Sequence, residues 1–338
     1  MKPKVLLDPS FRGLDVIFTP KDMARMKDAA EILWASNQLI PEEEIEKIQD
    51  EIEIIICGYW RYGDVKRFPK LRAILEVGGG FPAPDGLDYA HCFSHGIRVL
   101  SCSPAFCPAV AEMALGLALA CSRQIAWTDQ AFRHGMPQWS HSELDTELGT
   151  PFTLYGKSVG LIGFGGLADS LRPLLAPFNC DIQVYDPWLT DTFIEQHGVK
   201  SVDLNTLMAT SRVIFVLATP SSSNKALLDR EKLSLIQPDA VFILISRAHV
   251  VDFDVLTEML LEGRFVAGID VFPEEPLPQE HPIHKANHAV LSSHRAGANE
   301  EALLEIGRYV ADDLEAICAG KVPFAMKQAE PEYIRLRG

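Results

Sequence analysis

The stretch Val159-Gly-Leu-Ile-Gly163-Phe-Gly165-Gly-Leu-Ala168 decides the fold of this chain. An apolar run of strand length, residues 158–162, leads directly into glycines spaced as G-x-G-x-x-A. Gly163 permits a tight turn, Gly165 lets the backbone approach a pyrophosphate, and Ala168 allows a helix to pack closely on the strand. The pattern therefore predicts the strand, turn and helix that open a dinucleotide-binding unit.

The residues after this pattern predict the kind of dinucleotide. The unpaired amides of Gly166 and Leu167, at the positive end of the expected helix, favour phosphate groups. Asp186 ends the next predicted strand, where a carboxylate accepts hydrogen bonds from ribose hydroxyls and repels a 2′-phosphate. We therefore expect NAD rather than NADP. The alternative is a glycine turn in an α/β core, with Asp186 as a solvated strand end.

Short apolar strands alternate with helical stretches along the whole chain. This alternation predicts an α/β protein with two doubly wound parallel sheets, and 338 residues suit two domains. Pro108 to about Phe132 is apolar at helical spacing and predicts one long helix that leaves the first domain and enters the second. The expected strands are Lys4–Leu7, Ile52–Cys57, Arg72–Val77, Arg98–Leu100, Ser158–Ile162, Ile182–Tyr185, Arg212–Leu217, Ala240–Ile245, Val266–Ile269 and Val290–Ser292.

Composition excludes several classes of function. The 31 Lys and Arg residues against 46 Asp and Glu give a net charge of −15, which disfavours nucleic acid as a partner. Seven cysteines without a CxxC pair indicate reduced thiols in a cytoplasmic protein. No signal peptide is expected, because Asp8 and Pro9 follow the first residues too soon for an apolar region. The apolar run 109–121 is interpreted as a buried helix, too short to span a membrane.

Three charged or titratable residues in the second half have the chemistry of keto acid reduction. Arg247 offers a permanently charged planar fork for a carboxylate. His294, within Leu291-Ser-Ser-His-Arg-Ala-Gly297, suits proton transfer to the carbonyl oxygen because imidazole titrates near neutral pH. Glu275 suits the task of orienting the ring and stabilising imidazolium. Taken singly, each has an alternative: a surface arginine, an acid in a Pro-rich loop and a core histidine.

The order of cofactor loop, Arg247, Glu275 and His294 resembles the D-isomer-specific 2-hydroxyacid dehydrogenases, most closely from about Val77 to Ala302. The resemblance implies a Rossmann NAD-binding domain at 105–297. It also implies a smaller, discontinuous, flavodoxin-like substrate domain at 1–104 and 298–338, with the active site in the cleft between the domains. It further implies a homodimer formed through residues 124–157.

The same resemblance implies roles for individual residues. Asp270 would meet the nicotinamide carboxamide, and Gly79 and Gly80, in Val77-Gly-Gly-Gly80, would present backbone amides to the substrate carboxylate. The implied catalytic residues are Arg247, Glu275 and His294. The implied cofactor contacts are Gly163, Gly165, Gly166, Leu167, Asp186, Thr219, Ile245, Ser246, Asp270 and Gly297.

The chain also departs from the family pattern. Gly166 and Asp169 stand where the family often has basic residues, and Asp169 is a poor neighbour for phosphates. Pro173 falls inside the expected helix and predicts a kink or an early end. Ala248 and Ser293 replace the usual glycine and proline beside the catalytic residues, without removing a reacting group.

The expected function is hydride transfer between NAD and a small D-2-hydroxy acid or 2-keto acid. Glyoxylate or hydroxypyruvate reduction and phosphoglycerate oxidation are alternatives within that class. A different alternative is an NAD-sensing binding protein that does not turn over. The aromatic segment Tyr59–Tyr62, with Arg61, either encloses a substrate side chain or forms an interface patch. The spacing of His281, His284 and His288 is only loosely that of metal ligands, and no metal is expected.

Overall fold

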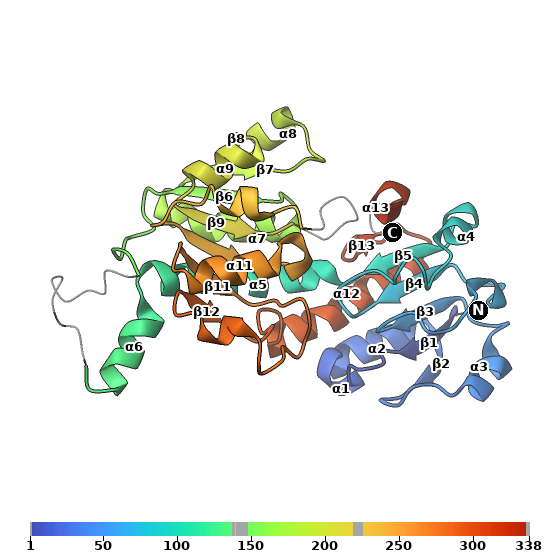
Figure 1. Ribbon diagram of the computed structural model, residues 1–338. Coiled ribbons are helices and arrows are strands. Elements are labelled where there is room, and N and C mark those ends of the chain that lie inside the picture. The colour runs from blue at the N-terminus through green and yellow to red at the C-terminus, as the bar shows by residue number, and fades with distance from the viewer. Residues whose placement is uncertain (1, 137–138, 140–147, 219–225, 336–338) are drawn as a thin grey trace. The chain divides into compact units, whose positions relative to one another are not determined.

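The computed structural model describes residues 2–136, 139, 148–218 and 226–335. They form two compact units, Met1–Cys107 with Gly297–Gly338 (unit 1) and Pro108–Ala296 (unit 2). Each unit has its own sheet with helices packed on both faces (Figure 1). The predicted α/β class with two doubly wound, largely parallel sheets is therefore confirmed.

Unit 1 is built on a sheet with the strand order β13-β5-β4-β3-β1-β2. All neighbouring strands are parallel except β13, which pairs antiparallel with β5. Apart from β13, this is the flavodoxin-like order 2-1-3-4-5, with the reversal of strand order at β1 and β3. The strands are β1 (Lys4–Asp8), β2 (Glu31–Ala35), β3 (Ile54–Cys57), β4 (Ala73–Glu76), β5 (Arg98–Ser101) and β13 (Lys327–Gln328).

Helices cover both faces of the unit 1 sheet. One core contains Ile17, Met26 and a stripe of α12, and the other contains Ile45, Tyr89 and Ile334. The helices are α1 (Leu14–Ile17), α2 (Pro20–Ala29) and α12 (Glu300–Cys318) on the first face, and α3 (Glu42–Ile48), α4 (Tyr89–Ser94) and α13 (Pro331–Arg335) on the second, with a 3₁₀ turn η1 at Val65–Arg67. Because α12 follows unit 2 in the chain, unit 1 is discontinuous.

Unit 2 is built on a parallel sheet with the strand order β12-β11-β10-β9-β6-β7-β8. Its reversal of strand order lies at β6 and β9, as in Rossmann domains. The strands are β6 (Ser158–Ile162), β7 (Asp181–Tyr185), β8 (Lys200–Ser201), β9 (Val213–Val216), β10 (Val241–Leu244), β11 (Val266–Ile269) and β12 (Ala289–Leu291).

Two apolar cores sandwich this second sheet. One face packs against α5, α7 and α8, and the other against α9, α10 and α11. The helices are α5 (Ser103–Ser122), α6 (Ile125–Arg133), α7 (Gly166–Leu175), α8 (Asp191–Glu195), α9 (Leu204–Thr210), α10 (Arg230–Leu233) and α11 (Phe253–Leu261), with 3₁₀ turns η3 (Ala176–Phe178), η4 (Ala248–Val250) and η5 (Pro282–Lys285).

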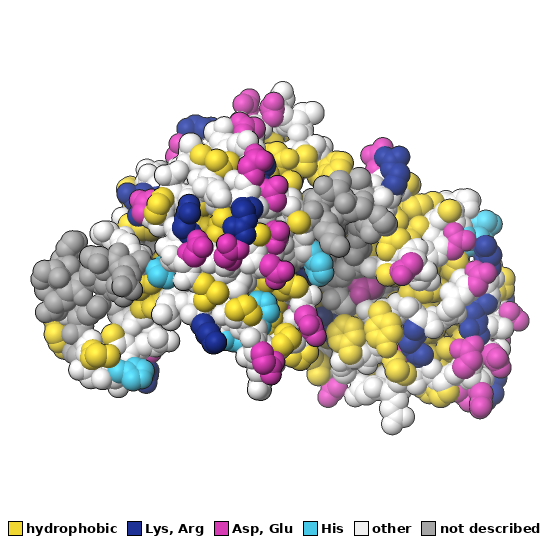
Figure 2. All heavy atoms as spheres, in the orientation of Figure 1, with side chains coloured by type: hydrophobic (Ala, Val, Ile, Leu, Met, Phe, Trp, Pro, Cys, Tyr) yellow, Lys and Arg dark blue, Asp and Glu magenta, His cyan; other side chains and the backbone are white. Residues whose placement is uncertain are grey.

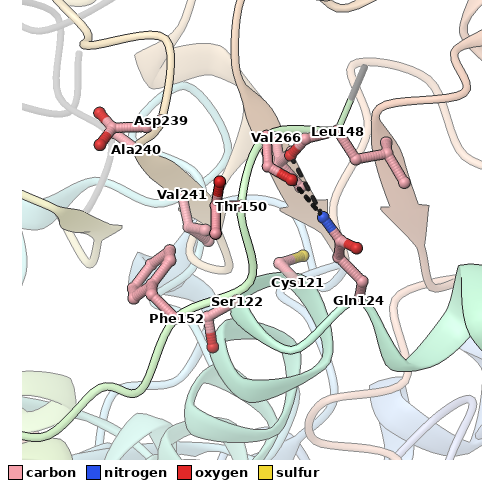
Figure 3. Close-up of a pocket in the computed structure, with 11 residues that line it drawn as sticks. Cys121, Ser122, Gln124, Leu148, Thr150, Phe152, Asp239, Ala240, Val241 and Val266 are labelled. Atoms are coloured by element: carbon pink, nitrogen blue, oxygen red, sulfur yellow. Dashed lines mark hydrogen bonds between the residues drawn. The ribbon is translucent and has the colours of Figure 1, made fainter. Parts of the chain in front are cut away.

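The predicted single helix from Pro108 to about Phe132 is wrong, because the structure has two helices there. Helix α5 starts earlier, at Ser103, and Gln124 separates it from α6 with a left-handed backbone (φ 55°). The buried Gln124 side chain donates a hydrogen bond of 2.9 Å to the carbonyl of Gly149 and reaches that of Leu148, so it ties this break to the segment that returns to β6 (Figure 3).

Helix α5 is also longer than the apolar run suggested. By length and composition alone, its 20 residues would be enough to cross a membrane, and 39% of that window is buried inside the protein. The predicted start at Pro108 is wrong because the helix begins five residues earlier, at Ser103. The buried residues Ala111, Ala114, Leu117 and Cys121 lie in the core of unit 2.

Candidate active site

The glycine loop after β6 is shaped by close backbone packing. Gly163 has φ +98°, and a Cβ atom there would lie 2.8 Å from backbone atoms of Ala218. Only glycine fits both constraints. Gly165 precedes α7 with nothing within 4 Å of its would-be Cβ, so a ligand can come close to this backbone. Ala168 is fully buried against the strand.

The first turn of α7 offers unpaired donors. Gly166 is exposed and Leu167 is half-buried. Their backbone N–H groups donate to no acceptor among the described residues. Together with the helix dipole they form a phosphate-binding terminus. Asp169 is exposed and lies 3.6 Å from Arg172 of the same helix. Pro173 does not end α7, which continues to Leu175 before tightening into η3.

Asp186 lies beside the glycine loop, directly after β7. Its Oδ2 accepts a hydrogen bond of 2.9 Å from the amide of Phe164, and its Oδ1 accepts one of 2.9 Å from the amide of Trp188. Each carboxylate oxygen keeps a further acceptor position. The side chain can therefore fix the loop and still receive ribose hydroxyls. These features of β6, α7 and Asp186 fit a nicotinamide dinucleotide.

Arg247 begins the loop that follows β10. Ile245 and Ser246 are buried, and the Ser246 hydroxyl has no hydrogen-bond partner among the described residues. Arg247 is exposed, and its Nη1 donates a hydrogen bond of 2.7 Å to the Ser246 carbonyl. The buried residues before it thus fix the backbone of Arg247, while its guanidinium group reaches the surface of unit 2.

Asp270 holds the loop that carries His294. The aspartate follows β11 and is fully buried. Its carboxylate accepts hydrogen bonds from the amides of Arg295 (2.9 Å) and Ala296 (3.1 Å), and its carbonyl accepts one from the amide of His294 (2.8 Å). His294 itself has φ 52°, a backbone strain that these three bonds maintain.

His294 and Glu275 form a side-chain pair. The Nδ1 atom of His294 lies 2.5 Å from Oε2 of Glu275, whose Oε1 accepts the amide of Phe272 at 3.0 Å. Partial burial raises the pKa of Glu275, but the hydrogen bonds from His294 and Phe272 and the charges of His294 and Arg247 lower it below its usual value. An ionised Glu275 fixes the tautomer in which Nδ1 carries hydrogen and leaves Nε2 for proton transfer.

The three predicted catalytic residues, Arg247, Glu275 and His294, therefore lie together in unit 2. The Glu275 carboxylate is close enough to Arg247 for the positive charge to lower its pKa. Their combined chemistry is a cation for a carboxylate, a proton donor or acceptor, and an acid that orients it. Thr219, predicted as an adenosine-side contact, lies outside the described residues.

In unit 1, the backbone amides of the predicted substrate loop already have an acceptor within the protein. The amides of Gly79 and Gly80 donate to the carboxylate of Glu76 at 3.2 and 3.1 Å. Gly297 also belongs to unit 1, where a Cβ atom would lie 2.8 Å from the Phe106 ring. Glu76 was not predicted from the sequence, although an acid at the end of an apolar strand and before three glycines is the signal that marks it.

The segment Tyr59–Tyr62 is largely committed to internal contacts. Arg61 donates a hydrogen bond of 2.6 Å to Asp8, Tyr62 is buried and bonded to the same carboxylate, and Trp60 donates to a backbone carbonyl. Only Tyr59 is exposed among the large apolar side chains of this segment.

The histidines considered as metal ligands show no metal-like cluster. His281 uses Nδ1 to accept the amide of Ile283 and so caps η5. Across the described residues, no three His, Cys, Asp or Glu side chains gather as a set of metal ligands.

Comparisons with known proteins converge on one family. Residues 115–296 match the model of the D-isomer specific 2-hydroxyacid dehydrogenase, NAD binding domain. The chain is 32% identical over 272 residues to a glyoxylate reductase of Thermofilum pendens, covering 79% of this chain and 78% of that protein. It is 28% identical over 288 residues to a D-3-phosphoglycerate dehydrogenase of Methanocaldococcus jannaschii, covering 84% of this chain and 53% of that protein.

A solved structure extends the similarity over nearly the whole chain. A phosphoglycerate oxidoreductase from Rhizobium etli is 34% identical, with a TM-score of 0.82, and the match covers 97% of this chain and 99% of that one. The similarity therefore includes both units and not the dinucleotide-binding unit alone.

Proposed function

Because the chain belongs to the D-isomer specific 2-hydroxyacid dehydrogenase family, we propose that it transfers a hydride between NAD and a D-2-hydroxy acid or the corresponding 2-keto acid. The protein is an oxidoreductase of this family with a Rossmann unit for a nicotinamide dinucleotide. The observation that carries the proposal is the 2.5 Å contact of His294 with Glu275 in the same unit as Arg247.

Each residue has one task in this proposal. The nicotinamide, when bound, supplies or accepts the hydride. Arg247 binds the substrate carboxylate and polarises the neighbouring carbonyl. His294 donates a proton from Nε2 to the carbonyl oxygen during reduction and takes it back during oxidation. Glu275 holds the ring through Nδ1 and stabilises the protonated form.

The cofactor contacts of the proposal follow the loops at the carboxyl ends of the unit 2 strands. Gly163, Gly165, Gly166 and Leu167 receive the pyrophosphate, and Asp186 receives the adenine ribose. On the nicotinamide side we propose Ile245, Ser246 and Asp270, and we propose Gly297 as a further cofactor contact. The unpaired buried hydroxyl of Ser246 supports this placement, since such a group is costly unless something pairs with it.

Relatives of two kinds narrow the set of candidate substrates within this class. Glyoxylate and hydroxypyruvate reductases and phosphoglycerate dehydrogenases all match this chain. We propose a small 2-keto acid, with these as the first compounds to try. The alternative of an NAD-sensing protein without turnover is not favoured, because the complete set Arg247, Glu275 and His294 has no use in binding alone.

The test is oxidation of NADH by a panel of 2-keto acids, with NADH affinity measured separately. We expect turnover with at least one compound, a fall of about 10²–10⁴-fold in kcat for His294→Gln with NADH affinity kept, and a large fall in kcat/KM for Arg247→Lys, which loses the planar fork. A His294→Gln protein as active as the wild type would overturn the assignment. NADH binding with no turnover on any compound would favour the sensing protein.

We also propose that the protein is a cytoplasmic homodimer that binds neither nucleic acid nor membranes. All seven cysteines are free thiols, which suits a reducing compartment. Acidic and basic side chains are interspersed over the face shown in Figure 2. Phe132, Met136 and Trp139 are exposed apolar residues in the described part of 124–157, which supports this segment as the dimer contact. Light scattering of the wild type and of Phe132→Glu tests the dimer.

A further inference from the structure

Helix α4 of unit 1 presents two histidines side by side. His91 and His95 are the only histidines in the sequence of unit 1. His91 lies within α4 and His95 is its C-cap, and residues four positions apart lie on the same face of a helix. Their rings stack, with ring centres 3.9 Å apart and planes inclined by 25°. Two side chains of a kind that binds metals are therefore in direct contact, on a helix that carries no residue of the candidate active site.

The inner face of α4 holds the helix in place beneath this pair. Tyr89 and Cys92 are buried in the apolar core of unit 1, and the N-cap Asp88 accepts a hydrogen bond of 2.9 Å from the amide of His91. A helix of six residues is too short to be stable alone, so these contacts fix the backbone that carries the two rings. On the outer side His91 is half-buried and His95 is exposed, and Figure 2 shows histidine atoms at the surface of unit 1.

The hydrogen bonds of His95 set the state of its ring. Its Nδ1 lies 3.0 Å from the backbone carbonyl oxygen of His91 and 3.1 Å from Oγ of Ser94. A carbonyl oxygen only accepts, so Nδ1 carries the hydrogen and donates it. Nε2 then keeps its lone pair. Metal-ligating histidines almost always donate their other ring N–H in this way, often to a backbone carbonyl.

The ring of His91 has its nitrogens available. Within the part of the chain that the structure describes, its ring contact is the stacking on His95, and its ring nitrogens take part in no hydrogen bond. Two nitrogens bound to one ion at about 2.0–2.1 Å each can be at most about 4.2 Å apart. Rings whose centres lie 3.9 Å apart are compatible with that limit.

The charges around the pair favour a cation. The amide of His91 and the ammonium of Lys66 lower the pKa of Asp88, and the charge of His91 adds to this effect, so an ionised carboxylate lies near the pair. Cys92 is not a third ligand, because burial raises the pKa of its thiol to about 11 and metals bind the thiolate. Two imidazoles without a thiolate suit first-row divalent ions such as Cu²⁺, Ni²⁺ and Zn²⁺.

We propose that His91 and His95 form a two-histidine chelate for a first-row divalent metal ion on the outer face of α4. Nε2 of His95 and a ring nitrogen of His91 bind the ion, and water completes its coordination. The site is independent of the proposed hydride transfer. A bound ion links α4 to its own C-cap and stabilises the folded state by mass action.

The test is a calorimetric titration of the full chain with NiCl₂, in a buffer that does not bind metals. The variants are His91→Gln and His95→Gln, and His134→Gln is the matched control. His134 is the exposed C-cap of α6, and its Nδ1 lies 2.7 Å from the carbonyl oxygen of Gln130. It reproduces the local geometry of His95, but the residue four positions earlier is a glutamine.

We expect the wild type to bind one Ni²⁺ ion per chain at this pair. His91→Gln and His95→Gln should each weaken the affinity at least about tenfold, since even the loss of an outer partner of a metal ligand costs about 10–100-fold. His134→Gln should bind like the wild type. Ni²⁺ should raise the thermal midpoint of the wild type and of His134→Gln more than that of the other two variants. Equal midpoints without metal show that the variants are folded.

Three results would overturn the proposal. An unchanged Ni²⁺ affinity in either His91→Gln or His95→Gln means that the ion is not held by both rings. An equal loss of affinity in His134→Gln and His95→Gln means that a histidine at a helix C-cap binds Ni²⁺ without a second imidazole. A wild type that binds no Ni²⁺ shows that the stacked pair is not a metal site.

Discussion

The Nδ1 atom of His294 lies 2.5 Å from Oε2 of Glu275, and the second oxygen of that carboxylate accepts the amide of Phe272. The pair is half-exposed, so it adds little to the free energy of unfolding. Its main effect is to orient the imidazole ring of His294. The carboxylate holds the histidine from the side away from Nε2. That arrangement predicts what the loss of the carboxylate does to proton transfer.

Replacing Glu275 with Gln should lower kcat and leave NADH affinity unchanged. The variant keeps the shape of the side chain but loses the carboxylate that pairs with Nδ1 of His294, so the ring is no longer held in the tautomer that leaves Nε2 for proton transfer. We expect a fall in kcat of about 10²-fold, at the lower end of the range for general acid–base catalysis. The rates are measured at saturating cofactor.

Glu274 is the natural control for this experiment, because it is the adjacent acid and no contact with His294 is seen for it in the described structure. Glu274→Gln should leave kcat unchanged. A wild-type kcat in Glu275→Gln means that Glu275 does not act on His294.

Asp270 predicts an effect on catalysis through the loop it holds. Asp270→Asn replaces one acceptor of the amides of Arg295 and Ala296 with a donor, which leaves a buried group unpaired and costs about 1–3 kcal/mol. We expect a lower thermal midpoint and a lower kcat, because His294 lies in the loop that these hydrogen bonds hold in place. Asp203→Asn, at the exposed N-cap of α9, should lower stability slightly and leave kcat unchanged. Wild-type kcat in Asp270→Asn contradicts this positioning role.

Asp186 predicts the choice of cofactor. Its carboxylate repels a 2′-phosphate and accepts ribose hydroxyls, so kcat/KM should favour NADH over NADPH by at least about tenfold, equivalent to ~1.4 kcal/mol. Asp186→Ser should reduce this ratio, mainly by losing NADH efficiency. Asp181→Asn, at the other end of the same strand and paired with Lys200 on the surface, is the control. Equal use of both cofactors by the wild type contradicts the assignment.

The parts of the fold that follow from local pattern could be predicted from the sequence. Buried strands such as β6 and β10 are continuous apolar runs, and the turn at Gly163 requires a residue that tolerates φ +98°. By contrast, β2 is an edge strand with mixed polarity, and β13 has only two residues. Neither has a period long enough to detect.

The break at Gln124 and the contents of the glycine loop could not be predicted for a different reason. A left-handed glutamine leaves no mark in composition, since it depends on partners at Leu148 and Gly149 that are distant in sequence. Three glycines do indicate free amides. The path of the loop decides whether the Glu76 carboxylate turns back to accept hydrogen bonds from these amides. Periodicity in the sequence does not encode that path.

Glu76 predicts how stability depends on pH. Burial raises its pKa to about 8, against the opposing effect of the amides of Gly78, Gly80 and Gly79 and of the charge on Arg12. The unfolded chain has the ordinary value near 4.5, so the folded state binds the proton more tightly over the window from about 4.5 to 8. The contribution of this group is fully present below that window and is lost as the pH rises through it.

The wild type should therefore lose stability relative to Glu76→Gln as the pH rises from about 5 to 8, by roughly 3–4 kcal/mol for a shift of this size. Glutamine resembles the protonated acid and carries no proton to lose. Thermal midpoints of both proteins are compared at several pH values, with Glu46→Gln, an exposed acid on α3, as the control that should follow the wild type. Parallel curves for the wild type and Glu76→Gln mean that the carboxyl group is ionised throughout. In that case the three amides and Arg12 outweigh its burial, and the loop holds a full negative charge at neutral pH.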